Sequence, residues 1–206
     1  MAKIKFTKTE QKHQQDALKQ FQRFLPTLQL KKQQLQLEVR QSAEALEANL
    51  AAQAELEREL AGCIAFFADA EMAELVSGCV TVEQVITGSA NIAGINIPTF
   101  DHVVFAPKKW DLFETPWYVD DAIAALKSAV SLREAYKVLS VQYRLLSDEL
   151  RMTSQRVNLF EKVKIPECRE NIRKIRIMLG DADTAAVARS KIAKRKSAEV
   201  FDLEAV

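Results

Sequence analysis

The chain has 206 residues, of which 48% are hydrophobic and 28% are charged, and its formal net charge is +1. This length allows one or two domains, and its apolar runs are shorter than the ~20 residues that a membrane-spanning helix needs. The first residues, MAKIKFTKTEQ, lack the apolar core of a signal peptide. We therefore expect a cytoplasmic protein without direct membrane insertion, either free or peripheral on the cytoplasmic face of a membrane.

The three cysteines, Cys63, Cys79 and Cys168, are far apart and odd in number. They have neither the paired spacing of a zinc site nor the even count of a disulfide framework. We expect them to be small buried side chains.

Residues that break helices gather in the middle of the chain. Of five prolines and five glycines, three of each lie between residues 78 and 116. They are Pro98, Pro107, Pro116, Gly78, Gly88 and Gly94. Because these residues interrupt helices, we expect a helical arm over 1–75, a central segment over 76–115 and a second helical arm over 116–196. The last residues, 197–206, are expected to form a flexible tail.

The first arm has the pattern of a coiled-coil helix. In TKTE, Thr7 can cap a helix that begins near residue 8, and Glu10 can bond back to it. A heptad register then continues for fifteen positions, eleven of them apolar or Cys. Its members are Leu18, Phe21, Leu25, Leu28, Lys32, Leu35, Val39, Ser42, Leu46, Asn49, Gln53, Leu56, Leu60, Cys63 and Phe67. Because a straight helix drifts ~20° per heptad from this period, the register predicts a supercoiled helix facing a partner.

The second arm begins at ETPWYVDDA, where Thr115 can cap a helix, Pro116 fits its first position and two aspartates follow. Its seam again alternates steps of three and four, then shifts register after Phe160. The members are Leu132, Tyr136, Leu139, Tyr143, Leu146, Leu150, Thr153, Val157 and Phe160, then Ile165, Cys168, Ile172, Ile175 and Leu179. Gly180 is expected to interrupt the helix.

Two such arms predict a mainly α fold, a long antiparallel two-helix coiled coil with a small central segment. Each helix would have roughly 60 residues and a length of ~90 Å. The alternative is a compact bundle of four shorter helices. The polar seam positions Lys32, Ser42, Asn49 and Gln53 either fix the register or face a third partner or water.

The central segment has the residues of a β-hairpin. Ile95 and Ile97 alternate with polar or small residues, and HVVFA is rich in β-branched and aromatic side chains. We expect two short strands between Ile92 and Ala106, preceded by VTVEQVI as either a short helix or a strand. Four aromatic residues should pack this hairpin onto the coiled coil or onto another protein: Phe100, Phe105, Trp110 and Phe113.

Charge is segregated along the chain. Residues 1–32 carry eight Lys or Arg against two Asp or Glu, and residues 169–196 carry nine against three. An antiparallel hairpin brings both basic segments to one end. This basic end can bind nucleic acid through phosphates, enter an acidic socket on a partner, or be a solvated helix end.

No catalytic constellation is evident. His13 and His102 have no nucleophile placed beside them by the sequence, and the chain lacks GxxxxGK[ST] and GxGxxG loops. Glu44 and Glu47 lie outside the seam, as in a solvated helix face. We therefore expect no enzyme activity in the isolated chain and no catalytic, cofactor-binding or metal-binding residues.

Three stretches resemble the family of D subunits of V-type (archaeal and vacuolar-type) ATP synthases. These are LPTLQLKKQQLQLEV in the first arm, NIAGINIP followed by TPWYVDDAI in the middle, and RVNLFEKVKIPECRENIRKI in the second arm. The similarity covers roughly residues 3 to 196. It departs from the family pattern at LGDADTAAVARSKIAKRK, where the family has a run rich in glutamate and arginine.

The resemblance implies a non-catalytic central rotor shaft that transmits torque between ATP turnover and proton or sodium transport through a membrane ring. It implies four partners: the A and B subunits of the catalytic hexamer, the small F subunit of the rotor, and the C (d-type) subunit at the ring. It also implies a position on the cytoplasmic face of the membrane and no cofactor. The alternatives are a free-standing coiled-coil adaptor or chaperone, and a nucleic-acid-binding protein.

Pro26 lies inside the first heptad register, where proline costs about 3 kcal/mol. If the arms meet near residues 72 and 120, Pro26 lies opposite residue 166, which is also a proline. We therefore expect both helices to bend at one level of the coiled coil.

Overall fold

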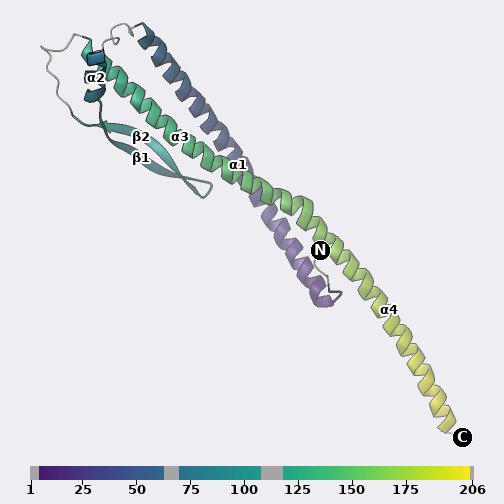
Figure 1. The fold of residues 1–206 in the computed structure, drawn as a ribbon. Coiled ribbons are helices and arrows are strands. Elements are labelled where there is room, and N and C mark those ends of the chain that lie inside the picture. Colours follow the sequence, from purple (N-terminus) through teal and green to yellow (C-terminus); the bar gives the residue numbers. More distant parts are fainter. Residues whose placement is uncertain (1–4, 63–69, 108–117, 205–206) are drawn as a thin grey trace. The chain divides into compact units, whose positions relative to one another are not determined.

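The computed structural model describes residues 5–62, 70–107 and 118–204. Its elements are the helices α1 (Lys8–Ala61) and α2 (Ala70–Cys79), the strands β1 (Val82–Ile92) and β2 (Ile95–Phe105), the helix α3 (Val119–Leu159), the short π-helix η2 (Phe160–Lys164) and the helix α4 (Ile165–Glu204) (Figure 1). The long helices and the hairpin confirm the expected mainly α coiled-coil fold, and the bundle of four shorter helices is not formed. No helix in the described ranges is long and apolar enough to cross a membrane.

The chain divides into two compact units, which we describe separately. Unit 1 consists of residues 1–30 and 154–206, and unit 2 consists of residues 31–153. In each unit a part of α1 pairs with a helix from the second half of the chain. The expected division at residues 75, 115 and 196 stays a prediction.

Helix α1 begins as the sequence predicts. The backbone N–H of Glu10 donates to the Thr7 hydroxyl at 3.2 Å, which confirms Thr7 as the cap. The expected return bond from Glu10 is replaced, because its carboxylate accepts from the Gln14 amide at 2.8 Å. The expected cap of the second arm, Thr115 and Pro116, lies outside the described residues, and α3 begins at Val119 with two aspartates in its first turn.

Unit 2 is built around one layer in which three elements meet. Leu35 of α1, Leu146 of α3 and Ile97 of β2 are each at most 1% exposed and pack together. The hairpin thereby lies along the helix pair (Figure 1). Lys127 of α3 also lies over the ring of Phe105, 5.8 Å from its centroid. Trp110 and Phe113 lie outside the described residues.

The hairpin is longer than expected. Its strands run over 82–92 and 95–105 rather than between Ile92 and Ala106. The last five residues of VTVEQVI therefore belong to a strand and not to a helix. The strands are joined by Ala93 and Gly94, whose φ angles are 52° and 83°. A two-residue turn with both φ angles positive matches the right-handed twist of the strands. The Asn91 side chain supports it by accepting from the Gly94 N–H at 3.1 Å.

The short helix α2 packs on the start of α3. Val76 and Cys79 of α2 form a buried cluster with Val119, Ala122 and Ile123. Cys79 is a free, buried cysteine, as expected. This cluster fixes the end of unit 2 from which the hairpin leaves.

Unit 1 pairs the start of α1 with the end of α3, η2 and α4. Phe21 and Phe160 meet with ring centroids 5.0 Å apart. The expected interruption at Gly180 is wrong, because α4 continues through it to Glu204. Gly180 is tolerated because an exposed helical glycine costs only about 1 kcal/mol relative to alanine. The flexible tail over 197–206 stays a prediction.

We expect Leu146→Ala to lower the free energy of unfolding by about 2–5 kcal/mol, because it empties a fully buried layer shared by three elements. Urea unfolding of the full chain followed by circular dichroism measures this. The control is Val141→Ala on the same helix, where the side chain is 41% exposed and we expect a change within about 0.5 kcal/mol. Equal effects of the two substitutions would contradict the described core.

Candidate functional site

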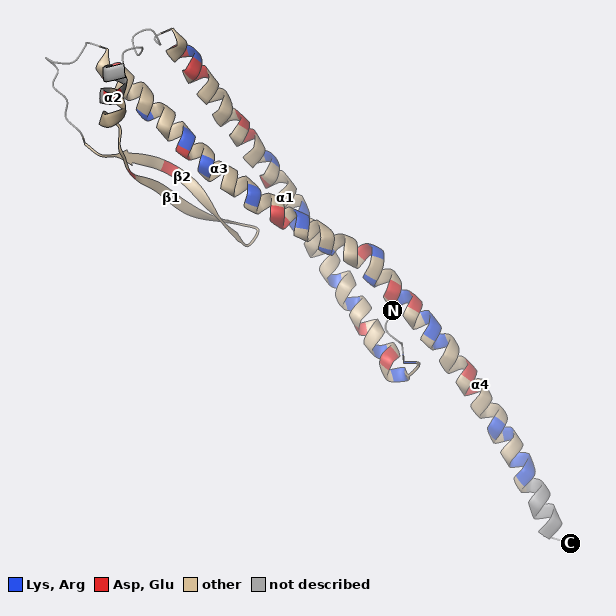
Figure 2. Cartoon of the chain, in the orientation of Figure 1, with Lys and Arg blue, Asp and Glu red and all other residues tan. Residues whose placement is uncertain are grey.

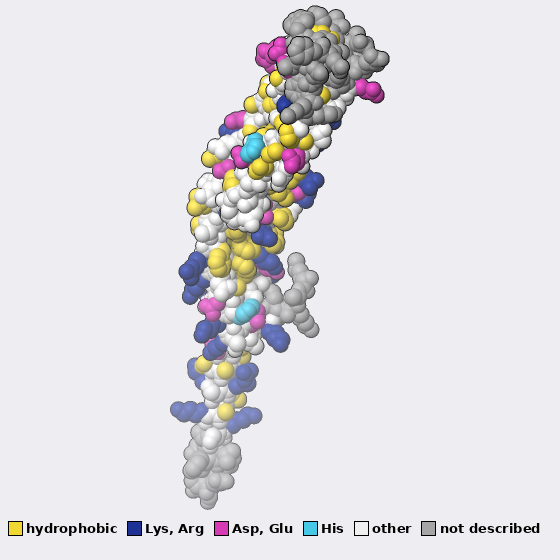
Figure 3. All heavy atoms as spheres, turned by 90° about the vertical axis from the view of Figure 1, so that its left-hand side faces the viewer, with side chains coloured by type: hydrophobic (Ala, Val, Ile, Leu, Met, Phe, Trp, Pro, Cys, Tyr) yellow, Lys and Arg dark blue, Asp and Glu magenta, His cyan; other side chains and the backbone are white. Residues whose placement is uncertain are grey.

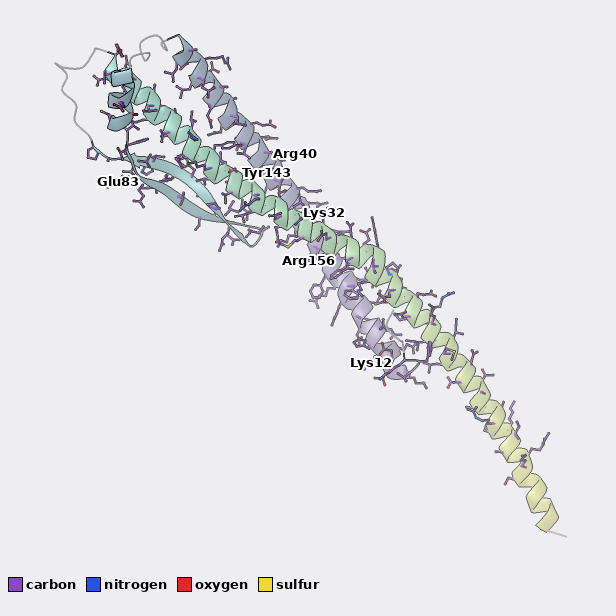
Figure 4. All side chains as sticks on the ribbon, viewed as in Figure 1. Lys12, Lys32, Arg40, Glu83, Tyr143 and Arg156 are labelled. Atoms are coloured by element: carbon purple, nitrogen blue, oxygen red, sulfur yellow. The ribbon has the colours of Figure 1, made fainter. Side chains whose placement is uncertain are left out.

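The candidate functional feature of this chain is the seam along its paired helices. All thirteen described positions of the first heptad register, from Leu18 to Leu60, are buried or half-buried. Cys63 and Phe67 lie outside the described residues. In the second register every position is buried or half-buried except Tyr143, which is 36% exposed (Figure 4). The seam was thus predictable from the spacing of apolar residues.

An ion pair crosses the seam of unit 2. The Lys31 ammonium lies 2.7 Å from the Glu149 carboxylate, and these side chains are 31% and 17% exposed. The pair lies one turn from the buried layer of Leu35 and Leu146. Sliding one helix past the other would break this pair and separate two partly buried charges, which is costly.

Three polar residues are buried along the seam: Ser42, Thr153 and Asn171. In unit 1 the Asn171 amide donates to the Gln14 side chain at 3.5 Å. In unit 2 the Gln53 amide lies 2.6 Å from Asn49 Oδ1 and donates weakly to the Leu132 carbonyl at 3.4 Å. These bonds support the interpretation that polar seam residues specify the register.

The π-helix η2 explains the register shift in the second arm. The Ile165 N–H bonds to the Phe160 carbonyl, five residues earlier. A π-turn inserts one extra residue, so a step of five from Phe160 to Ile165 stays on the seam. Pro166 follows directly. A proline has no backbone N–H to donate, and its ring clashes with the carbonyl four residues earlier in a regular α-helix.

Pro26 and Pro166 do not lie directly opposite each other. The residue numbers of the unit 1 pairs Phe21–Phe160 and Gln14–Asn171 add up to 181 and 185, not to the expected 192. Pro26 therefore lies across from residues 155–159, about 10–16 Å from Pro166 along the pair. The expected pairing of Pro26 with residue 166 is therefore wrong, because α1 ends at Ala61, well before residue 72. The expected bend of both helices at one level stays a prediction. The helix α1 is unbroken at Pro26, which is exposed.

Charge divides between the two units. Unit 1 carries 18 Lys and Arg against 10 Asp and Glu, a net charge of +8, whereas unit 2 carries 11 against 18, a net charge of −7. The ribbon positions of Lys and Arg, coloured blue, accordingly recur along the described part of α4 (Figure 2). Both basic segments that the sequence singles out, apart from Lys31 and Lys32, belong to unit 1.

Helix α4 is solvent-covered over most of its last half. Every residue from Asp181 to Ser197 is exposed, including Val187 and Ile192 at 55% and 51%. Nearer the seam, Leu18 of α1 and Ile172 of α4 line an open hollow of about 280 Å³ that three arginines surround. Dark blue side chains with apolar ones between them are visible around α4 in the lower part of Figure 3.

Side chains that could bind a metal are dispersed in the part of the chain that the structure describes. The described residues contain no group of three or more His, Cys, Asp or Glu side chains that could hold a metal ion. His13 lies 3.8 Å from Glu10 in an exposed helix turn, and His102 lies 3.2 Å from its neighbour Asp101 on the hairpin. Each is a local surface pair.

Sequence reasoning missed the most informative polar contacts. Lys31 and Glu149 lie beside the heptad positions, not on them, and Asn171 was not assigned to the seam. The signal that could have found Lys31 and Glu149 is their opposite charge about one helical turn from the paired seam leucines, four residues before Leu35 and three after Leu146. It can be used only once the register is known.

Comparisons with known proteins match most of the chain to one family. Residues 10–195 match a family model described as the D subunit of ATP synthase. A V-type ATP synthase D subunit of Borreliella burgdorferi is 45% identical over 94% of this chain and 95% of its own length. The corresponding D subunits of Chlamydia trachomatis serovar L2 and Chlamydia muridarum are 35% and 32% identical, each over 95% of this chain and 96% of their own length.

We expect Lys31 and Glu149 to show a coupling energy of about 0.5–1 kcal/mol in a double-mutant cycle with Lys31→Met and Glu149→Gln, because the pair is partly screened by water. Urea unfolding measures it. The pair Lys137–Glu134 within α3, in which the lysine side chain is 60% exposed, serves as the control and should couple more weakly. Additive effects at Lys31 and Glu149 would refute the cross-helix pair.

We expect the Cys168 thiol to resist alkylation by iodoacetamide at about pH 8 in the native chain. Burial raises its pKa above the ordinary 9.0, and the Glu167 carboxylate adds to the rise while Lys164 opposes it. The neutral thiol is therefore favoured by folding, so its contribution to stability is present below pH 9 and is lost as the pH rises through the raised pKa. Mass spectrometry of tryptic peptides measures the labelling, and the denatured chain is the control. Equal labelling of native and denatured chains would contradict the buried position.

Proposed function

Because this chain belongs to the family of ATP synthase D subunits, we propose that it is the central-stalk component, or rotor shaft, of a V-type rotary ATP synthase. In this role it has no catalytic residues of its own. It transmits torque between ATP turnover in a hexamer of A and B subunits and proton or sodium transport through a membrane ring. The observation that carries the proposal is the match to the family over residues 10–195, which includes both helical arms and the hairpin.

The physical requirement of a shaft is resistance to twisting and to sliding of its helices. A pair of helices resists twisting and sliding when the side chains of each seam layer pack against one particular layer of the other helix. The Lys31–Glu149 pair and the Gln14–Asn171 bond supply such fixed layers in units 2 and 1, respectively. The hairpin adds a third element to the layer of Leu35 and Leu146, because Ile97 packs against both helices there.

The proposed partners are the A and B subunits, the small F subunit of the rotor and the C (d-type) subunit above the ring. The basic unit 1 supports placement of the paired termini within the hexamer, since a charge of +8 favours an oppositely charged surrounding. Unit 2 then remains for the F and C subunits. The complex would lie on the cytoplasmic face of the membrane, with the chain held there by its partners.

Co-expression of the full chain with the A, B and F subunits tests the proposal. We expect native mass spectrometry of the purified assembly to find one copy of this chain per hexamer, because a shaft occupies a single central position. Omission of the chain is the control and should leave a hexamer that lacks the F subunit. A stable homodimer that ignores these subunits would refute the shaft and favour the free-standing adaptor or chaperone, for which the comparisons give no support.

A further inference from the structure

The hollow on unit 1 combines an apolar floor with a flank of arginines. Its walls are Leu18 of α1 and, from α4, Ile172, Ile177 and three arginines: Arg169, Arg173 and Arg176. The hollow opens at the edge of the seam, where the seam positions Leu18 and Ile172 are only half-buried and Ile177 is 55% exposed. Apolar side chains so exposed gain about 25 cal/mol for each Å² that a partner covers.

Two of the three arginines are available for an anion. Arg173 is engaged within its own helix, where it donates two hydrogen bonds to the Glu170 carboxylate at 3.0 and 3.1 Å. These bonds hold the pKa of the Glu170 carboxyl below its usual value. Among the residues that the structure describes, neither Arg169 nor Arg176 lies within ion-pair distance of a carboxylate.

The spacing of the two free arginines sets the spacing of what they bind. Arg169 and Arg176 are seven residues apart, so they lie on one face of α4 about two turns, or ~10 Å, from each other. Ile172 lies between them on the side of the hollow. The pattern along this face is cationic, apolar and cationic.

A protein segment fits this pattern better than a nucleic acid does. A phosphate backbone can pair with the arginines but has no apolar group for a floor of leucine and isoleucine. The lining also has no aromatic side chain on which a base could stack, and such stacking is the usual source of affinity for single strands. Carboxylates are the other anions that arginine binds with two parallel hydrogen bonds.

We propose that this hollow docks an acidic segment of a neighbouring protein of the rotary complex, with two carboxylates about 10 Å apart, the two-turn spacing of the arginines, and a large apolar side chain between them. The carboxylates pair with Arg169 and Arg176, and the apolar side chain fills the space over Leu18, Ile172 and Ile177. The inference rests on the proposed function, because it takes the partner to be a component that surrounds unit 1.

Site-directed cross-linking in the assembled complex tests where the hollow docks. A photoreactive benzophenone amino acid replaces Ile177 in the full chain, which is assembled with the A, B and F subunits before illumination. The exposed position of Ile177 makes this substitution compatible with folding. We expect mass spectrometry to find the cross-link within a few residues of two or more Asp or Glu in a partner protein. Cross-links confined to neutral or basic segments would overturn the inference while the shaft itself stands.

Charge reversal tests the role of the arginines. We expect Arg169→Glu/Arg176→Glu to weaken binding of the chain to the A and B hexamer at least about tenfold at low salt, because two attractive pairs become repulsive. The difference in affinity between the variant and the unmodified chain should shrink at high salt, because salt screens both the attraction and the repulsion. The matched control, Lys191→Glu/Lys194→Glu, makes the same change in charge on α4 away from the hollow and should have a smaller effect.

The outcomes separate the two proposals. If the unmodified chain fails to assemble at one copy per hexamer, the proposed function and this inference both fall. If it assembles, and the two double variants bind equally well, the inference alone falls. Circular dichroism of each variant confirms that it is folded. DNA binding that Arg169→Glu/Arg176→Glu abolishes and the control retains would also overturn the inference, in favour of a phosphate ligand.

Discussion

A pair of helices has one seam, and every other feature of this chain depends on the register of that seam. In a globular core a misplaced side chain has neighbours on all sides, whereas a layer of a two-helix pair mainly contacts the layer across from it. A slip by one turn would still bury leucine against leucine along much of the pair. The residues that make such a slip costly are therefore the irregular ones. Lys31 and Glu149 are the best example, because a slip would break the ion pair between two partly buried charges.

The β-hairpin contributes to the same constraint. Ile97 enters the layer of Leu35 and Leu146, and the half-buried Ala90 and Ile95 pack against it. The hairpin in turn depends on Ala93 and Gly94, because only a two-residue turn with positive φ angles keeps its strands in this pairing. A local choice of turn residues thus helps to align two helices that are far apart in the sequence.

Much of this architecture was predictable from periodicity, and the failures have physical reasons. The heptad pattern predicted the seam because burial repeats with the helix itself, and even the step of five after Phe160 was visible before its cause, the π-turn, was known. Gly180 was misjudged because local propensity is weak against a long continuous helix. The strands were predicted to begin too far along the chain, because apolar and polar residues do not alternate regularly over 82–92. The hollow beside Arg169 and Arg176 was unpredictable, since it needs the pairing of Leu18 with α4 to exist.

The antiparallel pairing also dictates the order in which contacts can form during synthesis. The bond from Gln53 to Leu132 spans 79 residues, the Lys31–Glu149 bond spans 118 and the Asn171–Gln14 bond spans 157. Each contact nearer the N-terminus must wait for a later part of the chain to leave the ribosome. Once the contacts near the hairpin have formed, each further layer closes only a short additional loop. The first residues to be made are consequently the last to find their partners, and until then the seam leucines of α1 are exposed and prone to aggregation.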